Sequence, residues 1–314
     1  MAGRSVAERL AVCSWSLRPK DPADLIAQLR QIGIMKVQLA LDPLRADPAW
    51  ANAKQQLAAG GVTVVAGMMG CEGEDYSSLD SIRRTGGVVP DATWPVTWQN
   101  IQKMAAIAKD LGADYVTFHA GFLPEEPTDP TYAKLQGRLS QVADLFAGLG
   151  ITIGFESGQE DGPTLKRFLD RLNKPNVAVN FDPANIILYD KGDPIDALRA
   201  LAPRVRQCHI KDAVRTTVPG QWGQEVVVGT GQVRWAEFFK VLGDAGFDGY
   251  FSCEREAGEN RIADVITAKN VVLAAAAAAK PAKKAKKKAR LAAKKKATAK
   301  KSSAAKKRAR RRKR

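Results

Sequence analysis

The sequence predicts an α/β fold, a (β/α)8 TIM barrel followed by a disordered basic C-terminal tail. Eight short apolar segments alternate with eight segments of helical periodicity between residues 10 and 272. Several of the apolar segments end on a residue type that binds metals, as expected where parallel strands meet at the carboxyl rim of a barrel. The chain of 314 residues can hold one such domain of roughly 250 residues and a further segment.

The first half of the chain predicts four strands and the helices between them. Asp, Asn, Pro and Gly stand at the boundaries, where they commonly start or stop such elements. Residues 70–94 form a long, polar, Gly-rich connection, and a connection of that length usually has a function, here to cover a site at the rim. We expect strands at residues 10–15, 35–41 and 62–68 and from 115, and helices at residues 21–33, 48–59 and 101–111.

The second half continues the alternation. Apolar residues recur with helical spacing between Leu135 and Phe146, which predicts a helix with one buried face. A loop is expected from 213 to 234, with Gly229 and Gly231 just before a helix that contains Trp235. We expect strands from 151 and at residues 177–182, 205–212 and 250–254, and further helices at residues 161–172, 193–201 and 262–272.

Four residues that can bind a metal ion stand at the ends of the last four predicted strands. They are Glu156, Asp182, His209 and Glu254. Three carboxylates around one imidazole would force each other to take up protons unless a cation were present. The alternative for each acid is a helix cap or a pair with a nearby Lys, but four such residue types on four consecutive strands favour a metal. The ligand set suits Mn²⁺ or Mg²⁺, with Co²⁺ and Zn²⁺ as alternatives.

The motifs around these residues resemble a known family. They read Gly-Phe-Glu156-Ser, Asn-Phe-Asp182-Pro-Ala-Asn, His209-Ile-Lys-Asp and Cys-Glu254-Arg-Glu, with a Gly229-x-Gly231 turn before Trp235. Over residues 8–275 the sequence resembles the sugar phosphate isomerase/epimerase family, the xylose-isomerase-like barrels that include the D-tagatose and L-ribulose 3-epimerases. The resemblance implies one divalent ion per chain, held by the four residues, with Glu156 and Glu254 as acid and base.

The resemblance also bears on substrate contacts. Arg215 stands where the epimerases place a substrate-contacting Arg, whereas Asn185 stands where they usually have a His. His119 and Lys211 are further candidates, although His119 could be a core histidine and Lys211 could pair with Asp212. Glu256 shares a strand face with Glu254 and is therefore its rival as acid or base. We expect Trp15, Trp94 and Trp222 to wall the sugar pocket.

These observations predict a divalent-metal-dependent sugar isomerase or epimerase. One glutamate would remove a proton next to a carbonyl and the other return one, through an enediolate stabilised by the ion. One alternative is an inosose-dehydratase-like lyase of the same barrel. A DNA-repair endonuclease of the endonuclease-IV type would need a three-zinc cluster with several histidines, and the chain has two. A catalytically silent barrel, anchored by the tail, is a third class. No phosphate-binding loop is evident.

The charge of the chain is divided unevenly, so the domains predicted are a barrel at residues 1–279 and a tail at 280–314. The tail holds 20 of the 49 Lys and Arg residues and no acid, which leaves a net charge of −4 before it. Its Ala/Lys/Arg composition predicts disorder. The tail would bind nucleic acid without sequence preference, although a merely solvated tail is the alternative. Its candidate contacts include Lys286, Lys287, Lys288, Arg310, Arg311 and Arg312.

The remaining features suggest the compartment. The four cysteines have no CxxC spacing, which favours buried, reduced thiols over a disulfide framework. Neither an export signal nor a membrane span is expected. We therefore expect a cytoplasmic protein, with nucleoid association through the tail, and a homo-oligomer is compatible with the sequence.

Overall fold

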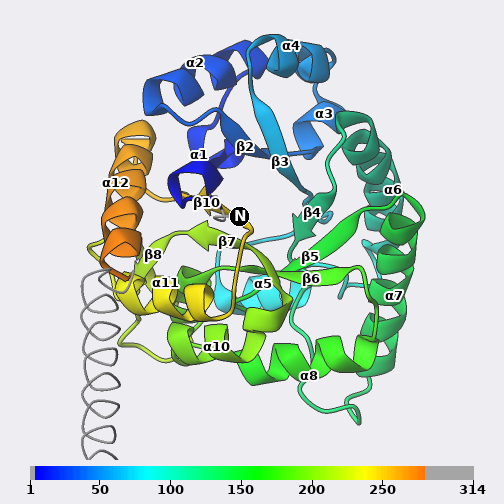
Figure 1. Ribbon diagram of the computed structural model, residues 1–314. Coiled ribbons are helices and arrows are strands. Elements are labelled where there is room, and N and C mark those ends of the chain that lie inside the picture. Colours follow the sequence, from blue (N-terminus) through cyan, green and yellow to red (C-terminus); the bar gives the residue numbers. More distant parts are fainter. Residues whose placement is uncertain (1–3, 280–314) are drawn as a thin grey trace, which may run out of the picture. The chain divides into compact units, whose positions relative to one another are not determined.

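Eight parallel strands pair edge to edge and close on themselves in the order β1-β10-β7-β6-β5-β4-β3-β2. The barrel is seen in Figure 1, a computed structural model that describes residues 4–279. The ring closes where β1 pairs with β10, through Leu10 opposite Phe251 and Val12 opposite Cys253. The predicted (β/α)8 fold is thus confirmed. The nucleic-acid contacts expected at residues 286–288 and 310–312 lie outside the described residues.

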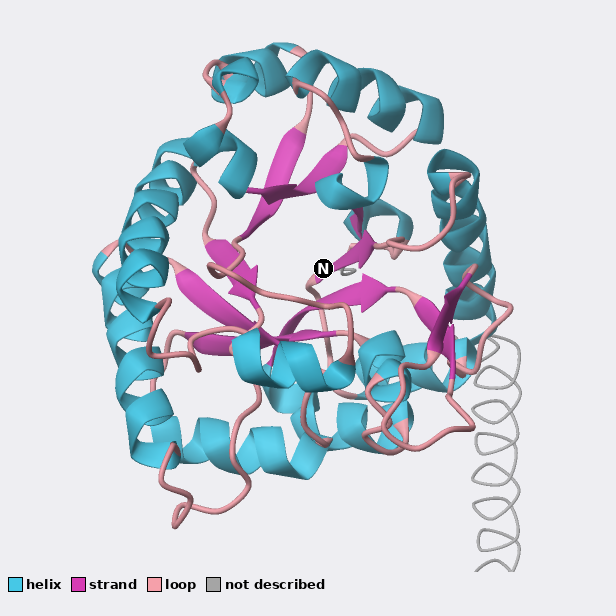
Figure 2. Cartoon of the chain, turned by 180° about the vertical axis from the view of Figure 1, so that it is seen from behind, coloured by secondary structure: helices cyan, strands magenta, loops and turns pink. Residues whose placement is uncertain are grey.

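Each barrel strand is four to six residues long, a usual length for a strand in an α/β barrel. Figure 2 shows the strands at the centre and helices around them. The barrel strands are β1 Leu10–Cys13, β2 Lys36–Ala40, β3 Thr63–Met68, β4 Tyr115–Phe118, β5 Thr152–Glu156, β6 Val177–Phe181, β7 Val205–Ile210 and β10 Tyr250–Cys253.

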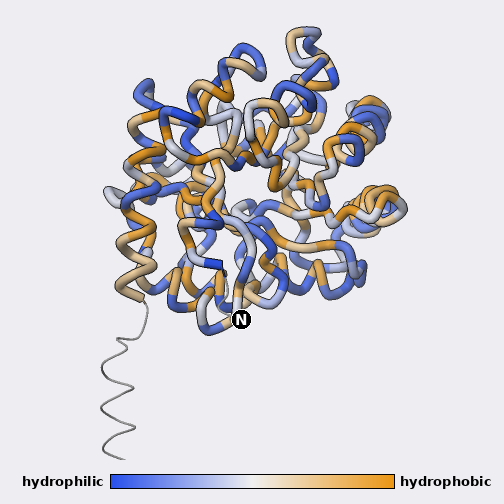
Figure 3. The backbone as a smooth tube through the Cα atoms, turned by 45° about the horizontal axis from the view of Figure 1, so that its top comes forward, coloured by the Kyte–Doolittle hydropathy of each residue, from blue (hydrophilic) through white to orange (hydrophobic). Residues whose placement is uncertain are grey.

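The helices cover the outside of this barrel. The main ones are α2 Pro22–Ile32, α4 Ala53–Ala59, α6 Trp94–Leu111, α7 Tyr132–Gly148, α8 Gly162–Leu172, α10 Pro194–Leu201, α11 Trp235–Asp244 and α12 Arg261–Ala279. Apolar and polar residues alternate along many of them in Figure 3, as expected of helices with one buried face. The Phe residues of the strands point outward to meet them, as the period-two pattern predicted. Phe181 contacts Phe238, and Phe251 contacts Phe239, both of α11.

Several short elements differ from the sequence-based expectation. The first strand ends at Cys13, and Trp15 lies in α1 (Ser14–Leu17). The connection at residues 70–94 contains α5 (Leu79–Thr85), and α6 already begins at Trp94. The other additions are α3 (Asp42–Ala46), α9 (Pro183–Leu188) and an antiparallel pair in the expected loop, β8 (Asp212–Val214) with β9 (Gln224–Val226). Most of these elements are too short to show a periodicity.

Helix α12 closes the barrel. By length and composition it could cross a membrane, and among the described residues only this helix meets that criterion. Its charged side chains nevertheless bond to the barrel domain. Asp264 accepts from Arg255 Nε at 2.9 Å, and Lys269 donates to the carbonyl oxygen of Ile32. Since α12 also buries Val265 and Val272, its contacts are those of the outer helix predicted for this segment.

Asp212 holds together the loop that leads into α11. Its buried carboxylate accepts from the backbone N–H of Gly229 at 2.9 Å, of Val233 at 3.1 Å and of Gly231 at 3.3 Å. It also accepts from the indole of Trp235 at 3.2 Å. A Cβ on Gly231 would lie 2.2 Å from Asp212 Oδ1, which explains the glycine in this motif. This acid therefore organises the backbone and is not free to pair with Lys211.

We expect Asp212→Asn to lower the free energy of unfolding by about 3 kcal/mol, because an amide N–H₂ would face buried N–H donors. Denaturant unfolding of the metal-free protein measures this. The matched control is Asp244→Asn, on exposed residue Asp244 of α11, which pairs with Lys240; it should cause little change. Equal losses in the two variants would contradict the role given to Asp212.

Candidate metal centre

The structure brings the four predicted metal ligands together. Glu156 is the last residue of β5, Asp182 follows β6, His209 lies in β7 and Glu254 follows β10. Because β5, β6, β7 and β10 are neighbours in the barrel, their carboxyl ends meet. One ligand atom from each residue lies within 4.8 Å of the others, and all four residues are buried.

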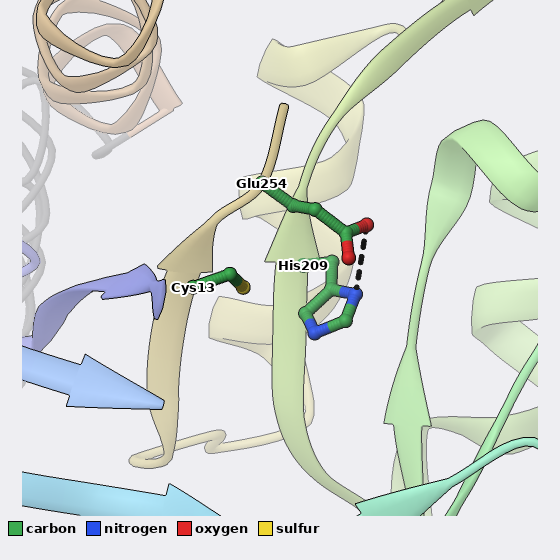
Figure 4. Close-up of side chains that lie close together, drawn as sticks. All are labelled: Cys13, His209 and Glu254. Carbon is green, nitrogen blue, oxygen red and sulfur yellow. Dashed lines mark ion pairs between the residues drawn. The ribbon is translucent and has the colours of Figure 1, made fainter. Parts of the chain in front are cut away.

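The imidazole of His209 is at the middle of the cluster. Its Nδ1 lies 3.2 Å from Glu254 Oε2, 3.4 Å from Glu156 Oε1 and 3.5 Å from Asp182 Oδ2. Figure 4 shows the His209 and Glu254 side chains turned toward each other. Within residues 4–279, His209 Nδ1, Asp182 Oδ2 and Glu254 Oε2 are buried atoms without a hydrogen-bond partner. Buried polar atoms are rarely left unsatisfied, so three that converge fit a bound cation.

The pKa shifts of the cluster residues also fit a bound cation. Burial lowers the pKa of His209, but Glu254 and Glu156 raise it well above its ordinary value. Burial raises the pKa of Glu254, but His209 and Lys211 hold it well below its usual range. The pKa of Asp182 is raised, chiefly by burial. The site therefore attracts positive charge, and three oxygens with one nitrogen suit Mn²⁺ or Mg²⁺.

Neighbouring side chains orient the ligands. The Trp15 indole N–H donates to Glu254 Oε1 at 2.7 Å, which leaves Oε2 facing the centre. Asp182 Oδ1 caps α9 by accepting from the N–H groups of Ala184 and Asn185, which leaves Oδ2 facing the centre. This capping explains why a helix starts directly after the ligand.

Glu156 is held by two amide side chains. Asn185 Nδ2 donates to Oε1 at 3.0 Å, and Asn180 Nδ2 donates to Oε2 at 3.1 Å. Asn180 was not among the predicted site residues. Asn180 lies in β6, two positions before Asp182, so the period-two pattern could have identified it. Asn185 was expected to contact substrate. It lines the cavity described below, and its amide also donates to Glu156.

A cavity of about 630 Å³ opens at the carboxyl rim, next to the cluster. Its walls include Glu254 and three of the predicted substrate contacts, His119, Asn185 and Lys211. Aromatic side chains from four separate segments complete it, namely Trp15, Tyr76, Tyr189 and Trp222. Tyr76 comes from the connection at residues 70–94 and packs edge-on against His119 at 5.9 Å, so this connection does reach the site.

Two expected contacts do not reach the cavity. Trp94 packs against Trp98 and beneath the guanidinium of Arg138, because it begins α6 on the outside of the barrel. Arg215 follows β8 and points to Asp190, with which it forms an ion pair, and to the carbonyl oxygen of Gly192. Arg215 is thus paired with Asp190 and is not among the residues that line the cavity.

Lys211 is buried between acids. Its Nζ lies 3.0 Å from Glu254 Oε2 and also pairs with Glu256. Burial lowers the pKa of Lys211, but Glu254 and Glu256 raise it well above its ordinary value, so the side chain is an ammonium ion. Glu256, the rival of Glu254, lies outside the four-residue cluster and its side chain is 52% exposed.

His119 lies between the cavity and the cluster. Its Nε2 is 3.6 Å from Glu156 Oε1, and its side chain is 16% exposed. Its Nδ1 has no hydrogen-bond partner among the described residues. No backbone hydrogen bond to the ring is found within residues 4–279, and His119 lines the cavity, where it can contact a bound molecule.

The cysteines are free thiols, as expected, and three of them are buried. Cys13 is another possible metal ligand, because its sulfur lies close to His209 and Glu254 (Figure 4). Burial raises the pKa of the Cys13 thiol. A metal ligand must be the thiolate, so Cys13 is a weaker candidate than the four oxygen and nitrogen ligands.

Comparison with known proteins places the fold and the cluster in context. A ketose 3-epimerase of Arthrobacter globiformis is 25% identical over 236 residues, covering 71% of this chain and 74% of that protein. The uncharacterized protein YihM of Escherichia coli is 27% identical over 130 residues, which is 41% of this chain and 39% of YihM. The match to YihM thus spans less than half of that protein.

Solved structures share the architecture. A xylose isomerase domain protein from Planctomyces limnophilus is 28% identical, with a TM-score of 0.74 and coverage of 85% of this chain and 95% of that one. An L-ribulose 3-epimerase has 18% identity and a TM-score of 0.66, covering 90% and 97%. A barrel protein from Mycobacterium smegmatis, solved in complex with magnesium, has 15% identity and a TM-score of 0.67, covering 88% and 100%.

The family assignment rests on the sequence as a whole. The family model described as "Xylose isomerase-like TIM barrel" matches residues 26–283, which is most of the chain. The described part of this range contains all four residues of the cluster and seven of the eight barrel strands. The chain belongs to the xylose isomerase-like TIM barrel family.

Proposed function

We propose that this protein is a divalent-metal-dependent sugar isomerase or epimerase. The observation that carries the proposal is the convergence of four ligand atoms beside the cavity, three of which have no hydrogen-bond partner within residues 4–279. Glu156, Asp182, His209 and Glu254 would hold one ion, with Mn²⁺ as the proposed metal. The ketose 3-epimerase and L-ribulose 3-epimerase similarities, and the magnesium in a related barrel, support this assignment.

The cavity lining suggests the class of sugar. Four carboxylates outside the metal cluster line it, those of Asp42, Glu74, Glu225 and Glu256. Three of them already pair with the cations nearby, Arg45, Arg255 and Lys211. Like charges across an interface disfavour binding. The lining therefore favours an uncharged polyhydroxy substrate over a phosphorylated one, and the aromatic walls suit the apolar faces of a sugar.

The mechanism assigns a proton transfer to each of two glutamates. When bound, the ion supplies positive charge that stabilises the enediolate formed by proton loss next to a carbonyl. Glu156 removes that proton, and Asn185 and Asn180 hold its carboxylate in place. For epimerisation, Glu254, held by Trp15, takes a proton from solvent and returns it at the opposite face; for isomerisation, a proton is returned at the neighbouring carbon. His119, Asn185 and Lys211 orient the substrate oxygens.

A lyase is the second candidate, and Lys211 is the observation that favours it. An ammonium ion in the cavity lining can donate a hydrogen bond to a departing hydroxyl group and stabilise its negative charge, which elimination of water requires and epimerisation does not. Proton removal by Glu156 is common to the two reactions. Mass analysis of the product separates them, because a lyase product lacks the mass of one water.

We expect Glu156→Gln to reduce deuterium uptake from solvent at a substrate carbon by 10²- to 10⁴-fold, the usual contribution of a general base. Ketoses and aldoses would be screened in D₂O with Mn²⁺ by NMR. The matched control is Glu126→Gln, an exposed glutamate on the loop before α7, and it should exchange at the wild-type rate. Wild-type exchange in Glu156→Gln, with metal bound, would remove Glu156 from the mechanism.

We also propose that residues 280–314 bind nucleic acid, because they carry 20 positive charges and no negative one. Counterion release should make binding fall steeply with added salt. The full chain should shift duplex DNA in a gel at low salt, whereas a chain that ends at residue 279 should not. Equal binding by the two proteins would contradict this proposal.

A further inference from the structure

We propose that Gln38 is a positioning residue of the metal centre, which holds His209 in the ring tautomer whose Nδ1 can bind a cation. This inference rests on the metal centre proposed above. Gln38 lies on β2 and reaches across the inside of the barrel to His209 on β7. Both side chains are fully buried. No sequence motif links the two residues.

The contact between them determines where the imidazole proton lies. Gln38 Oε1 is 3.0 Å from His209 Nε2. An amide oxygen only accepts, so this hydrogen bond needs the proton on Nε2. A neutral imidazole with its proton on Nε2 has its lone pair on Nδ1, the atom that faces the three carboxylates.

The orientation of the Gln38 amide is set by its other partners. Gln38 Nε2 donates to Thr117 Oγ1 at 2.7 Å, and the Thr117 hydroxyl in turn contacts the carbonyl oxygen of Gly67 at 3.5 Å. On the opposite side, Gln207 Nε2 donates to Gln38 Oε1. In this network the oxygen faces His209, and a flip of the Gln38 amide alone would place its N–H₂ against the N–H₂ of Gln207.

Asn180 makes the Gln38 contact necessary. Asn180 Nδ2 lies 3.0 Å from His209 Nε2 and also donates to Glu156 Oε2 at 3.1 Å. Because Asn180 Nδ2 is a donor, its contact favours the tautomer with the lone pair on His209 Nε2. That tautomer carries its proton on Nδ1, the atom that would have to bind the cation. Without the Gln38 oxygen, this donor would be the remaining polar partner of Nε2 within the described residues, and the unsuitable tautomer would prevail.

The test compares three variants in titrations with Zn²⁺ and in the visible spectrum of the Co²⁺ form. Gln38→Met removes the acceptor and should weaken Zn²⁺ binding 10- to 100-fold, as loss of a partner of a metal-bound histidine usually does. Gln38→Glu keeps an acceptor and should keep most of the affinity. The matched control is Asn100→Met, which removes a buried amide on α6 that bonds to Glu72 and not to the cluster; it should bind Zn²⁺ nearly as wild type.

Nitrogen NMR tests the tautomer directly and needs no variant. The chain has two histidines, so ¹⁵N-histidine labelling gives two ring spectra, and His119→Gln assigns them. In the Zn²⁺-loaded wild type we expect His209 to carry its proton on Nε2. A proton on Nδ1 would overturn the inference, even if Gln38→Met failed to fold.

The outcomes separate this inference from the proposed function. If the wild-type protein binds no divalent ion, the metal centre itself is wrong. If it binds one and Gln38→Met binds equally tightly with an unchanged Co²⁺ spectrum, Gln38 has no positioning role and the metal centre stands. A similar loss in Gln38→Met and Gln38→Glu would mean that packing, not the acceptor, matters.

Discussion

Three buried carboxylates around one imidazole are the constraint on which the site depends. Such a cluster is stable only if positive charge compensates it. The surrounding residues meet this demand in part: Lys211 supplies one charge, and Trp15, Asn180 and Asn185 donate hydrogen bonds to individual carboxylate oxygens. The oxygens and nitrogen that have no hydrogen-bond partner in the described part of the chain face one another, and this is the property that distinguishes a metal centre from a set of helix caps.

The barrel strands separate an apolar environment on their outer face from a polar environment inside the barrel. On the outer face of the strands, Phe side chains pack against helices such as α11. Inside the barrel, Gln38, Asn180 and Gln207 form a hydrogen-bonded polar layer that supports the ligands. The same strand therefore stabilises the fold on one face and positions the site on the other.

Much of the fold and the four candidate ligands could be predicted from the sequence, because the strands alternate with period two and end on chemically distinctive residues. The role of Gln38 could not, because it depends on a contact across the barrel between residues 171 positions apart. Two further contacts could not be predicted from the sequence. Arg215 forms an ion pair with Asp190. Strand β8 pairs with β9 inside a segment that has no clear strand pattern.

Binding of a single cation by the four residues can be examined by anomalous diffraction from a crystal soaked in Mn²⁺. We expect one peak per chain at about 2.0–2.4 Å from atoms of Glu156, Asp182, His209 and Glu254, typical of metal–ligand distances. No peak there at saturating Mn²⁺, or a peak coordinated by Cys13 in place of Glu156 and Asp182, would contradict it.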